Sequence, residues 1–399
     1  MQFNRFKEKE LSEVLLLNQS GTWGDNGDEN DYPILRSSNI QDGRLTLDDI
    51  AFRKISPKKV NEYTLDNGDI LITKSSGSPQ LIGKSCLFMN PNGKTFLFSN
   101  FTQRLRANKK IILPEILFYY LNSPRAKDFL QKISNTTSGL RNLNMRDFAK
   151  QPIPILPISE QQKIAFILEQ TDSARQKRKL ANQLTEQFLQ SAFLEMFGDP
   201  VKNEKEWEVE EVGDISTKVS SGSTPLGGAA VYKDSGITFI RSQNVLMNRF
   251  DYSNVAFISD EIHSNMKRTW LKKEDVLLNI TGASIGRVSF FEGIDDSANV
   301  NQHVCIIRVK KNKILPVFLS FQISIPTFQS SILSQNSGAT RQAFTFEQIK
   351  SFKIILPPLT EQQKFATLVE QVEKLRTKQR ESERELENLF GSLMQRYFG

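Results

Sequence analysis

The sequence predicts a mixed α/β protein in which two α/β domains of the same design alternate with two long α-helices. Three observations lead to this prediction. Motifs recur in the same order in both halves of the 399-residue chain. Each half begins with short β-like runs separated by turn residues, and each ends in a long stretch that no proline interrupts. A chain of this length is expected to form two or three domains, each with its own core.

The repeat is clearest in two segments, PISEQQKIAFIL at 157–168 and PLTEQQKFATLV at 358–369. The other paired motifs are RSSNI at 36 and RSQNV at 241, LDNGDILI at 65 and LKKEDVLL at 271, IGK at 82 and IGR at 285, TSGLR at 137 and NSGATR at 336, and ILP at 155 and 355. The offset drifts from about 206 to about 199 residues along the chain, as expected when surface loops change length around a retained core. This ordered series indicates an internal duplication.

The first part of each repeat is expected to be a compact α/β domain, at 1–157 and 199–357. Runs such as GDILIT, DVLLNI and VCIIRV are typical of short buried strands, and Gly, Asn and Ser between them favour turns. The stretch PEILFYYLNSPRAKDFLQKI has the spacing of a helix.

The second part of each repeat is expected to be one long helix, at 158–198 and 358–399. Ser159 or Thr360 follows a proline, and Gln162 or Gln363 lies three residues later, as in a capping box. Spacings of three and four predict a coiled-coil seam with a polar centre. The predicted seam is Ile164, Ile167, Thr171, Ala174, Arg178, Ala181, Thr185, Phe188 and Ala192 in the first helix, and Phe365, Leu368, Val372, Leu375, Gln379, Ser382, Leu386, Leu389 and Leu393 in the second. The two seams are expected to pack as an antiparallel coiled coil, although each helix could instead be buried on its own domain.

Helix length constrains what such a protein can do. About 38 residues form a helix of about 57 Å. If the helices are antiparallel, the chain order places the two domains at opposite ends of a rod, related by a pseudo-two-fold axis. Proteins with paired domains at a fixed distance meet two half-sites on duplex DNA, where spacing is read in helical turns of about 34 Å.

Charge and composition permit a polyanionic partner. The net charge is +7, from 52 Lys and Arg against 45 Asp and Glu. Residues 1–150 carry 22 basic and 16 acidic side chains, a net charge of +6, whereas 206–357 carry 16 and 15, a net charge of +1. No apolar run approaches the length of a membrane span, and the N-terminal segment lacks a secretory apolar region. With only two cysteines as well, a cytoplasmic location is expected.

Catalytic and metal-binding motifs are weak or missing. GSPQLIGKS at 77–85 imitates a phosphate-binding loop, but five residues separate its glycines where the motif needs four, and a strand-like run follows it. His303 and Cys305 lie two residues apart in an apolar strand, and His263 and Cys86 have no ligand-like neighbours, so all four are expected to be core residues. The sequence contains no Asp- or Asn-Pro-Pro-aromatic motif and no G-x-G-x-x-G loop. The chain is therefore predicted to be non-catalytic.

Candidate DNA contacts are polar residues that recur in both copies, because bases are read by Arg, Lys, Asn, Gln and Ser, and phosphates by basic groups. The candidates are Arg36, Ser37, Asn39, Lys74, Ser75, Lys84, Ser138 and Arg141 in the first domain, and Arg241, Gln243, Asn244, Thr281, Arg287, Ser337, Thr340 and Arg341 in the second. The alternative for any one of them is a structural role in a turn or a cap.

Taken together, these motifs make the whole chain resemble a type I restriction-modification specificity subunit. The second domain begins with SSGSTPLGG and GITFIRSQNV, which resemble the start of a target recognition domain in this family. The first domain departs from that start, with NQSGTWGDNGDENDYPILRSSNI, and resembles another subclass. The duplicated EQQK helix entry is also similar to that of the family.

The resemblance implies that the chain reads a bipartite, asymmetric double-stranded DNA target, with one half-site for each domain. It also implies that the helices hold two methylation subunits, and that restriction subunits join the larger complex. S-adenosylmethionine, ATP and Mg²⁺ are then expected on those partners, with no cofactor in this chain. Three alternatives stay open: a helical-hairpin scaffold that binds only proteins, an RNA-binding protein, and a modification system fused to restriction or lacking it.

Overall fold

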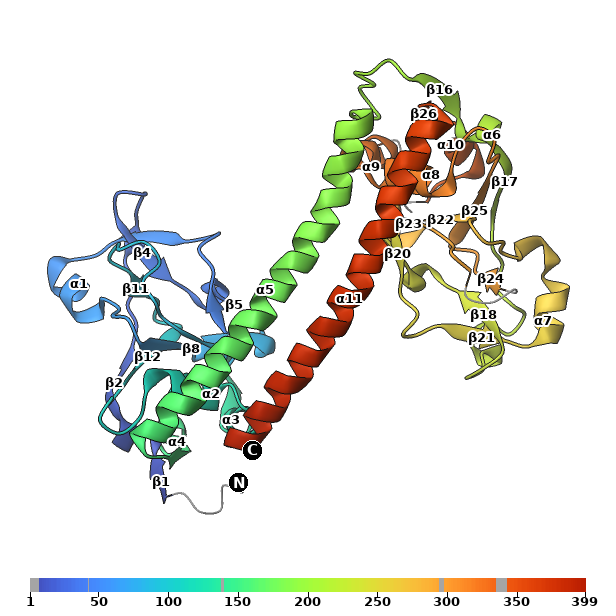
Figure 1. Cartoon of the computed structure of the whole chain (residues 1–399). Coiled ribbons are helices and arrows are strands. Elements are labelled where there is room, and N and C mark those ends of the chain that lie inside the picture. Colours follow the sequence, from blue (N-terminus) through green and yellow to red (C-terminus); the bar gives the residue numbers. More distant parts are fainter. Residues whose placement is uncertain (1–6, 42, 138–139, 294–297, 335–342) are drawn as a thin grey trace. The chain divides into compact units, whose positions relative to one another are not determined.

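The structure is a computed structural model, which describes residues 7–41, 43–137, 140–293, 298–334 and 343–399. The chain divides into two compact units, one made of Met1–Lys179 and Glu381–Gly399 and the other of Leu180–Arg380. Each unit combines an α/β domain with part of each long helix (Figure 1). The helices therefore do not form separate bodies, and each is shared between the units.

A four-stranded antiparallel sheet forms the centre of unit 1, with the order β10-β8-β12-β2. Its strands are β10 Ser85–Leu87, β8 Asp69–Thr73, β12 Thr102–Ala107 and β2 Leu15–Ser20. Strand β8 is buried at all five positions, with an uninterrupted apolar run of Ile70, Leu71 and Ile72 at its centre. Ile70 and Ile72 pack into one core cluster and Leu71 into another.

A second sheet, with the order β11-β4-β7-β3, contributes to the cluster around Leu71. Its strands are β11 Leu97–Phe98, β4 Tyr32–Leu35, β7 Ala51–Lys54 and β3 Asp25–Asn26. The smaller sheets are β1 Lys7–Glu10 with β15 Pro152–Ile155, β5 Ile40–Gln41 with β6 Arg44–Leu45, and β13 Ser134–Thr137 with β14 Leu140–Leu143 and β9 Ser75–Ser76. The helices are η1 Leu11–Val14, η2 Ser37–Asn39, α1 Pro57–Tyr63, η3 Pro79–Leu81, α2 Pro114–Leu121, α3 Pro124–Lys132 and α4 Met145–Ala149. Helices α1, α2 and α3 begin with proline, which favours the first helical turn.

Unit 2 repeats this design. Its central sheet has the order β17-β25-β22-β23, and a second sheet has the order β21-β18-β24. The strands are β16 Glu208–Glu211, β17 Ser216–Ser221, β18 Ile237–Ile240, β19 Val245–Leu246, β20 Arg249–Phe250, β21 Ala256–Ile258, β22 Val276–Asn279, β23 Val288–Phe290, β24 Ala298–Val300, β25 Val304–Val309 and β26 Lys353–Leu356. The helices are α6 Val212–Ile215, η4 Gly228–Val231, η5 Ser242–Asn244, α7 Asp260–Asn265, η6 Lys267–Thr269, η7 Gly282–Ser284, α8 Pro316–Ser324, α9 Pro326–Ser334 and α10 Phe346–Lys350. The matching strand orders confirm the internal duplication.

The long helices are α5 Ile158–Phe197 and α11 Leu359–Phe398. They are antiparallel within each unit. In unit 1, the Arg175 guanidinium binds the Glu387 carboxylate, and the start of α5 shares a core cluster with Met394 and Phe398. In unit 2, the rings of Phe193 and Phe365 lie 5.4 Å apart. The antiparallel packing predicted from the sequence is confirmed by these contacts.

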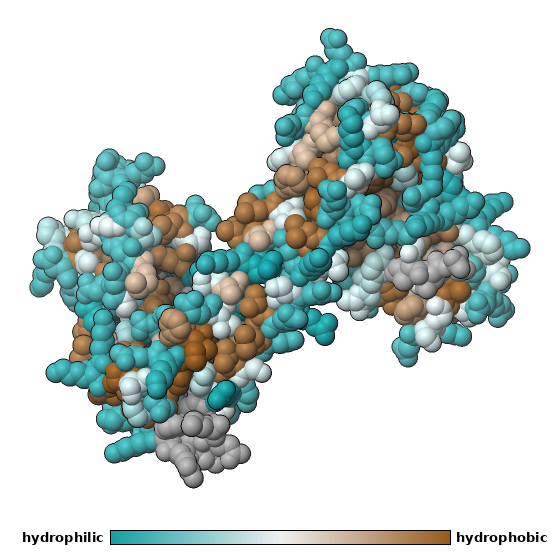
Figure 2. All heavy atoms as spheres, viewed as in Figure 1, coloured by the Kyte–Doolittle hydropathy of each residue, from teal (hydrophilic) through white to brown (hydrophobic). Residues whose placement is uncertain are grey.

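The predicted seam is half correct. Ile164, Thr171, Phe365 and Val372 are buried as expected. At Ile167, Phe188 and Leu368 the next residue is also apolar, and that neighbour is the one buried: Ile167 and Phe188 are 38% and 50% exposed, whereas Leu168, Leu189 and Val369 are buried. Leu375 and Leu389 are each 49% exposed. Apolar side chains consequently reach the surface along the helices (Figure 2).

The repeated EQQK motif ties each helix to its own domain. The Gln161 side chain accepts a hydrogen bond from Leu113 N (2.8 Å) and donates to Ile111 O (2.9 Å) and Leu156 O (2.8 Å). Gln362 repeats this pattern with Leu315 N (2.8 Å), Lys313 O (3.3 Å) and Pro357 O (2.8 Å). Both side chains are almost completely buried. One glutamine therefore fixes the start of each helix against the loop that precedes α2 or α8.

Candidate nucleic-acid interface

The first predicted cluster, RSxN, is a structural brace. Asn39 is 1% exposed; its Oδ1 accepts a hydrogen bond from Arg36 N, and its Nδ2 donates to Thr46 O (3.0 Å) and Asp49 O (3.1 Å). The Arg36 guanidinium donates to the main chain and the carboxylate of Asp49, both at 2.7 Å. The Asn39 amide and Nη2 of Arg36 are therefore engaged within the domain.

Unit 2 contains the same brace. Asn244 is 1% exposed, accepts from Arg241 N and donates to Asp251 O (2.9 Å) and Asn254 O (3.2 Å). Arg241 Nη2 donates to Asn254 O (2.8 Å). The prediction that Asn39 and Asn244 contact DNA is corrected, because buried amides with filled hydrogen bonds cannot reach a base. Ser37 is half-buried and Gln243 is exposed, so these two stay predictions.

The candidates Lys74 and Ser75 lie near the candidate Arg141 at one end of domain one. Strand β9 pairs with β14, which places Ser75 opposite Asn142 and Ser76 opposite Arg141. The side chains of Ser75 and Asn142 are hydrogen-bonded, and Lys74 Nζ donates to Ser20 Oγ (2.6 Å). Burial of the Lys74 ammonium lowers its pKa. Ser138 lies outside the described residues.

The backbone at this end is the same in both units. In unit 1, Lys74 N donates to Phe101 O, Gly21 N to Thr102 O, and Thr22 N to Phe98 O. The equivalents in unit 2 are bonds from Ile280 N to His303 O, from Gly222 N to Val304 O, and from Ser223 N to Val300 O. Two further bonds recur, from Thr102 N to Ser99 O and from Leu143 N to Lys74 O in unit 1, and from Val304 N to Asn301 O and from Phe344 N to Ile280 O in unit 2. We call the region joined by these five backbone hydrogen bonds the loop end of each domain. Its backbone is retained in both units, but its side chains differ.

In unit 2 the loop end holds a polar network. Thr281 Oγ1 lies 2.6 Å from His303 Nδ1, His303 Nε2 lies 3.0 Å from Gln302 Nε2, and Gln302 Oε1 is hydrogen-bonded to Thr224 Oγ1. Only Thr281 among these was predicted to contact DNA. His303 was predicted to be a core residue, but it is half-buried in this network. Ser337, Thr340 and Arg341 lie outside the described residues.

Lys84 and Arg287 occupy equivalent positions. Thr73 N donates to Lys84 O (2.9 Å), and Asn279 N donates to Arg287 O (2.8 Å). In unit 1, Lys84 and Arg141 line a hollow of about 1020 Å³ together with Lys127, Arg175 and Lys179. One of these cations has no charged counterpart in unit 2, because Gln329 of α9 stands in place of Lys127 of α3.

A buried ion pair also recurs beside the central sheet. The Arg106 guanidinium donates to Asp69 Oδ1 (2.7 Å) and Oδ2 (2.8 Å), and Arg308 binds Asp275 with 2.7 Å contacts. Hydrogen bonding to Asp69 raises the pKa of Arg106. Both carboxylates are 1% exposed, so each ion pair links neighbouring strands of the central sheet and is not accessible to a ligand.

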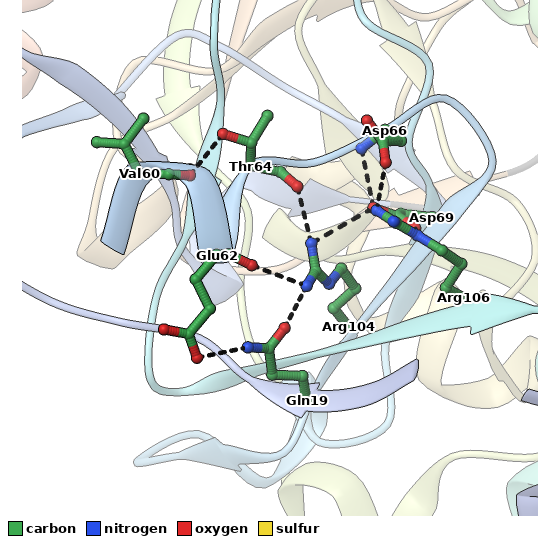
Figure 3. Close-up of polar contacts among 8 residues, drawn as sticks. All are labelled: Gln19, Val60, Glu62, Thr64, Asp66, Asp69, Arg104 and Arg106. Carbon is green, nitrogen blue, oxygen red and sulfur yellow. Dashed lines mark hydrogen bonds and ion pairs between the residues drawn. The ribbon is translucent and has the colours of Figure 1, made fainter. Parts of the chain in front are cut away.

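Unit 1 adds a second buried arginine to this ion pair (Figure 3). Arg104 is 3% exposed and donates to Thr64 O (2.7 Å), Glu62 O (3.1 Å) and the Gln19 side-chain carbonyl. Desolvation lowers its pKa, although the nearby Asp69 carboxylate acts in the opposite direction. Ile306 takes the equivalent place in unit 2, two residues before Arg308. Arg104 therefore ties the end of α1 to β12 in the first domain only.

The described residues contain no group of three or more His, Cys, Asp or Glu side chains that could hold a metal ion. Cys86 and Cys305 are fully buried, which raises the pKa of each thiol to about 12. His263 is 8% exposed and stacks on Trp270 at 4.5 Å. These three residues were correctly predicted to be buried.

The GSPQLIGKS segment is built as a turn that leads into β10. Gly83 N donates to Thr73 O (3.0 Å), so its N–H is not available to a phosphate. No described helix is suited to crossing a membrane, since even the two 40-residue helices lack an apolar stretch of sufficient length.

Comparison with protein families decides the class. The model of the Type I restriction modification DNA specificity domain matches residues 4–186 and again residues 204–388. The chain belongs to this family. It contains two copies of the specificity domain, one in each repeat, and is a specificity subunit of a type I restriction-modification system. The protein-scaffold alternative is not favoured by these matches.

Relatives extend over most of the chain. It is 24% identical over 403 residues to a protein assigned as the specificity subunit of the type I restriction enzyme MjaX of Methanocaldococcus jannaschii, covering 97% of this chain and 91% of the relative. It is 30% identical over 170 residues to the EcoKI specificity subunit of Escherichia coli K12, covering 41% of this chain and 36% of the relative. The crystal structure of the M. genitalium type I S subunit matches with a TM-score of 0.64 and 12% identity, over 99% of this chain and 97% of that one. That structure has the same fold.

Proposed function

We propose that each α/β domain of this specificity subunit reads one half of a bipartite, asymmetric duplex DNA target. The observation that carries the proposal is the loop end, where five backbone hydrogen bonds recur in both units. A shared frame with different side chains suits two domains that perform one task on different sequences, because base contacts are made by side chains that a rigid scaffold presents.

Basic groups beside the loop end support contact with phosphates. Arg141 lies on β14, Lys74 immediately precedes the paired strand β9, and Lys84 and Lys127 line the adjacent hollow. Arg175 also lines it, but its charge is balanced by Asp172 and Glu387. The remaining cations are suited to the DNA backbone, which dominates affinity in protein–DNA complexes.

The long helices, in this proposal, set the spacer between the half-sites and dock two methylation subunits. Support comes from apolar side chains that the described fold leaves uncovered on α5. Phe166 is 62% exposed, Leu180 is 55% exposed and Leu184 is 54% exposed. Exposed apolar side chains that gather on one element are typical of protein interfaces. We keep the division into domains at 1–157 and 199–357 and helices at 158–198 and 358–399 as the functional one.

Catalysis belongs to the partners in this proposal. The chain binds no cofactor itself; S-adenosylmethionine serves the methylation subunits, and ATP and Mg²⁺ serve the restriction subunits. The complex acts on DNA in the cytoplasm. Loss of methylation in cells that lack only this chain, with methylation restored by supplying it, would support this assignment.

Salt-dependent binding tests the proposal. The purified chain with its methylation subunit should bind target duplex DNA with an affinity that falls steeply as salt rises. Arg141→Ala and Arg341→Ala should each weaken binding and reduce the salt slope by about one. Arg125→Ala is the matched control, because Arg125 is already paired with Glu8 (2.6 Å). Binding that ignores salt, or that is equal in all three variants, would refute the DNA contacts proposed here.

A further inference from the structure

The exposed amide of Gln302 has a fixed position in unit 2. It lies in the turn between β24 and β25, where Val304 N donates to Asn301 O (3.2 Å) and His303 N donates to Asn301 Oδ1 (3.2 Å). The Gln302 side chain points to solvent but is hydrogen-bonded to Thr224 on one side and His303 on the other. An exposed glutamine side chain usually samples several rotamers, whereas two side-chain hydrogen bonds restrict that of Gln302.

The loop that carries Thr224 is equally constrained. A Cβ atom on Gly222 would lie 1.9 Å from Val300 O, so only glycine allows the backbone to approach β24 so closely. Gly21 makes the same approach in unit 1, where a Cβ would lie 2.2 Å from Ser99 O. Thr224 follows Gly222 by two residues, so this constrained turn places the Thr224 hydroxyl against Gln302.

Half of the hydrogen-bonding capacity of the Gln302 amide is unused within the protein. A glutamine amide has two N–H donors and an oxygen with two acceptor sites. Thr224 and His303 occupy one site on the oxygen and one on the nitrogen. Either orientation of the amide satisfies these two partners, because Thr224 and neutral His303 can each donate or accept. One donor and one acceptor then remain on Gln302.

We propose that Gln302 reads an adenine in the half-site of the second domain, with Thr224 and His303 as positioning residues. The inference rests on the proposed function and names one residue that carries specificity. A glutamine donor and acceptor, side by side, pair with the N7 and N6 positions of adenine in the major groove and with no other base in the same way. A side chain that must be preorganised to contact a base depends on the neighbouring side chains that hold its rotamer.

The equivalent turn of unit 1 supports the inference. There Asn100 takes the place of Gln302 and Phe101 the place of His303, on the same hydrogen-bonded backbone. Asn100 is exposed and carries the same amide on a side chain shorter by one methylene, and Phe101 is 44% exposed. An amide therefore recurs at this point in both domains, while its neighbour changes from a hydrogen-bonding ring to an apolar one.

Mapping of methylated adenines in cells that express the chain with its methylation subunit tests this inference. Gln302→Ala should relax one base pair of one half-site, with roughly a 10-fold or greater loss of preference, and leave the other half-site and the spacer unchanged. Gln302→Glu should move the preference at that base pair from adenine to cytosine, because a carboxylate accepts from cytosine N4. Asn100→Ala should relax a base pair in the opposite half-site.

The positioning roles have their own readout. Thr224→Val removes the hydroxyl and should reduce the base preference at the same base pair as Gln302→Ala. Thr224→Ser keeps the hydroxyl and should retain that preference. Gln363→Ala, at an exposed position of α11, is the matched control and should leave the motif unchanged. An unchanged motif in Gln302→Ala overturns the inference, as does relaxation of the same half-site by Gln302→Ala and Asn100→Ala. Absence of any split motif in the wild type would instead refute the proposed function.

Discussion

Replacement of Gln161 by alanine should destabilise unit 1 strongly. The side chain is 1% exposed and makes three hydrogen bonds, with Leu113 N, Ile111 O and Leu156 O. Alanine leaves these three backbone groups without a partner, which together costs roughly 3 kcal/mol. Since 1 kcal/mol shifts the Tm of a unit of about 200 residues by about 2–4 °C, the expected decrease is about 6–12 °C.

Differential scanning calorimetry can separate the two units. Gln161→Ala should lower the transition of unit 1, and Gln362→Ala, which breaks the equivalent bonds, should lower the transition of unit 2. Gln162→Ala and Gln363→Ala are matched controls, because both glutamines are exposed neighbours on the same helical turns. If Gln161→Ala melted within about 1 °C of Gln162→Ala, the anchoring role of the EQQK motif would be wrong.

Three further perturbations have definite outcomes. Asp275→Asn removes the buried partner of Arg308 and should cost roughly 3 kcal/mol in urea unfolding, whereas Glu274→Gln, in a more exposed pair with Lys311, should cost less than about 1 kcal/mol; equal costs would contradict the assigned burial. Burial raises the pKa of Cys86 and Cys305 to about 12, so neither thiol should react with a disulfide reagent at pH 8 until the protein unfolds, and stoichiometric labelling of the native chain would contradict this. Insertion of four residues after both Lys179 and Arg380 lengthens each helix by about 6 Å and should change the spacer of the methylated motif while leaving both half-sites intact; an altered half-site with the old spacer would refute the spacing role.

The duplication made much of the fold predictable. Matched motifs such as LDNGDILI and LKKEDVLL mark the same central strand in each sheet, and the long proline-free segments mark the two helices. The seam was predicted only in part, because pairs such as Ile167–Leu168 and Phe188–Leu189 offer two adjacent apolar side chains, and packing into the core of each unit selects one. Sequence periodicity has no information on that choice.

The candidate contacts show a different limit. Recurrence in both copies marked Asn39 and Asn244, but residues that brace a shared frame recur more faithfully than residues that read different sequences. Gln302 and His303, which we propose as a base-reading residue and its positioning neighbour, were not among the candidates because their counterparts are Asn100 and Phe101. A more informative signal than recurrence is a position where the residue differs between the two copies while the flanking backbone is retained.

The way the chain threads through its units has a consequence for synthesis. Unit 2 is an uninterrupted stretch, Leu180–Arg380, whereas unit 1 needs Glu381–Gly399 to complete it. Tyr120, in the core of the first domain, packs against Phe398 of α11. On the ribosome, the half that is translated first is therefore expected to finish folding last. Removal of residues 381–399 should therefore leave unit 2 folded and destabilise unit 1.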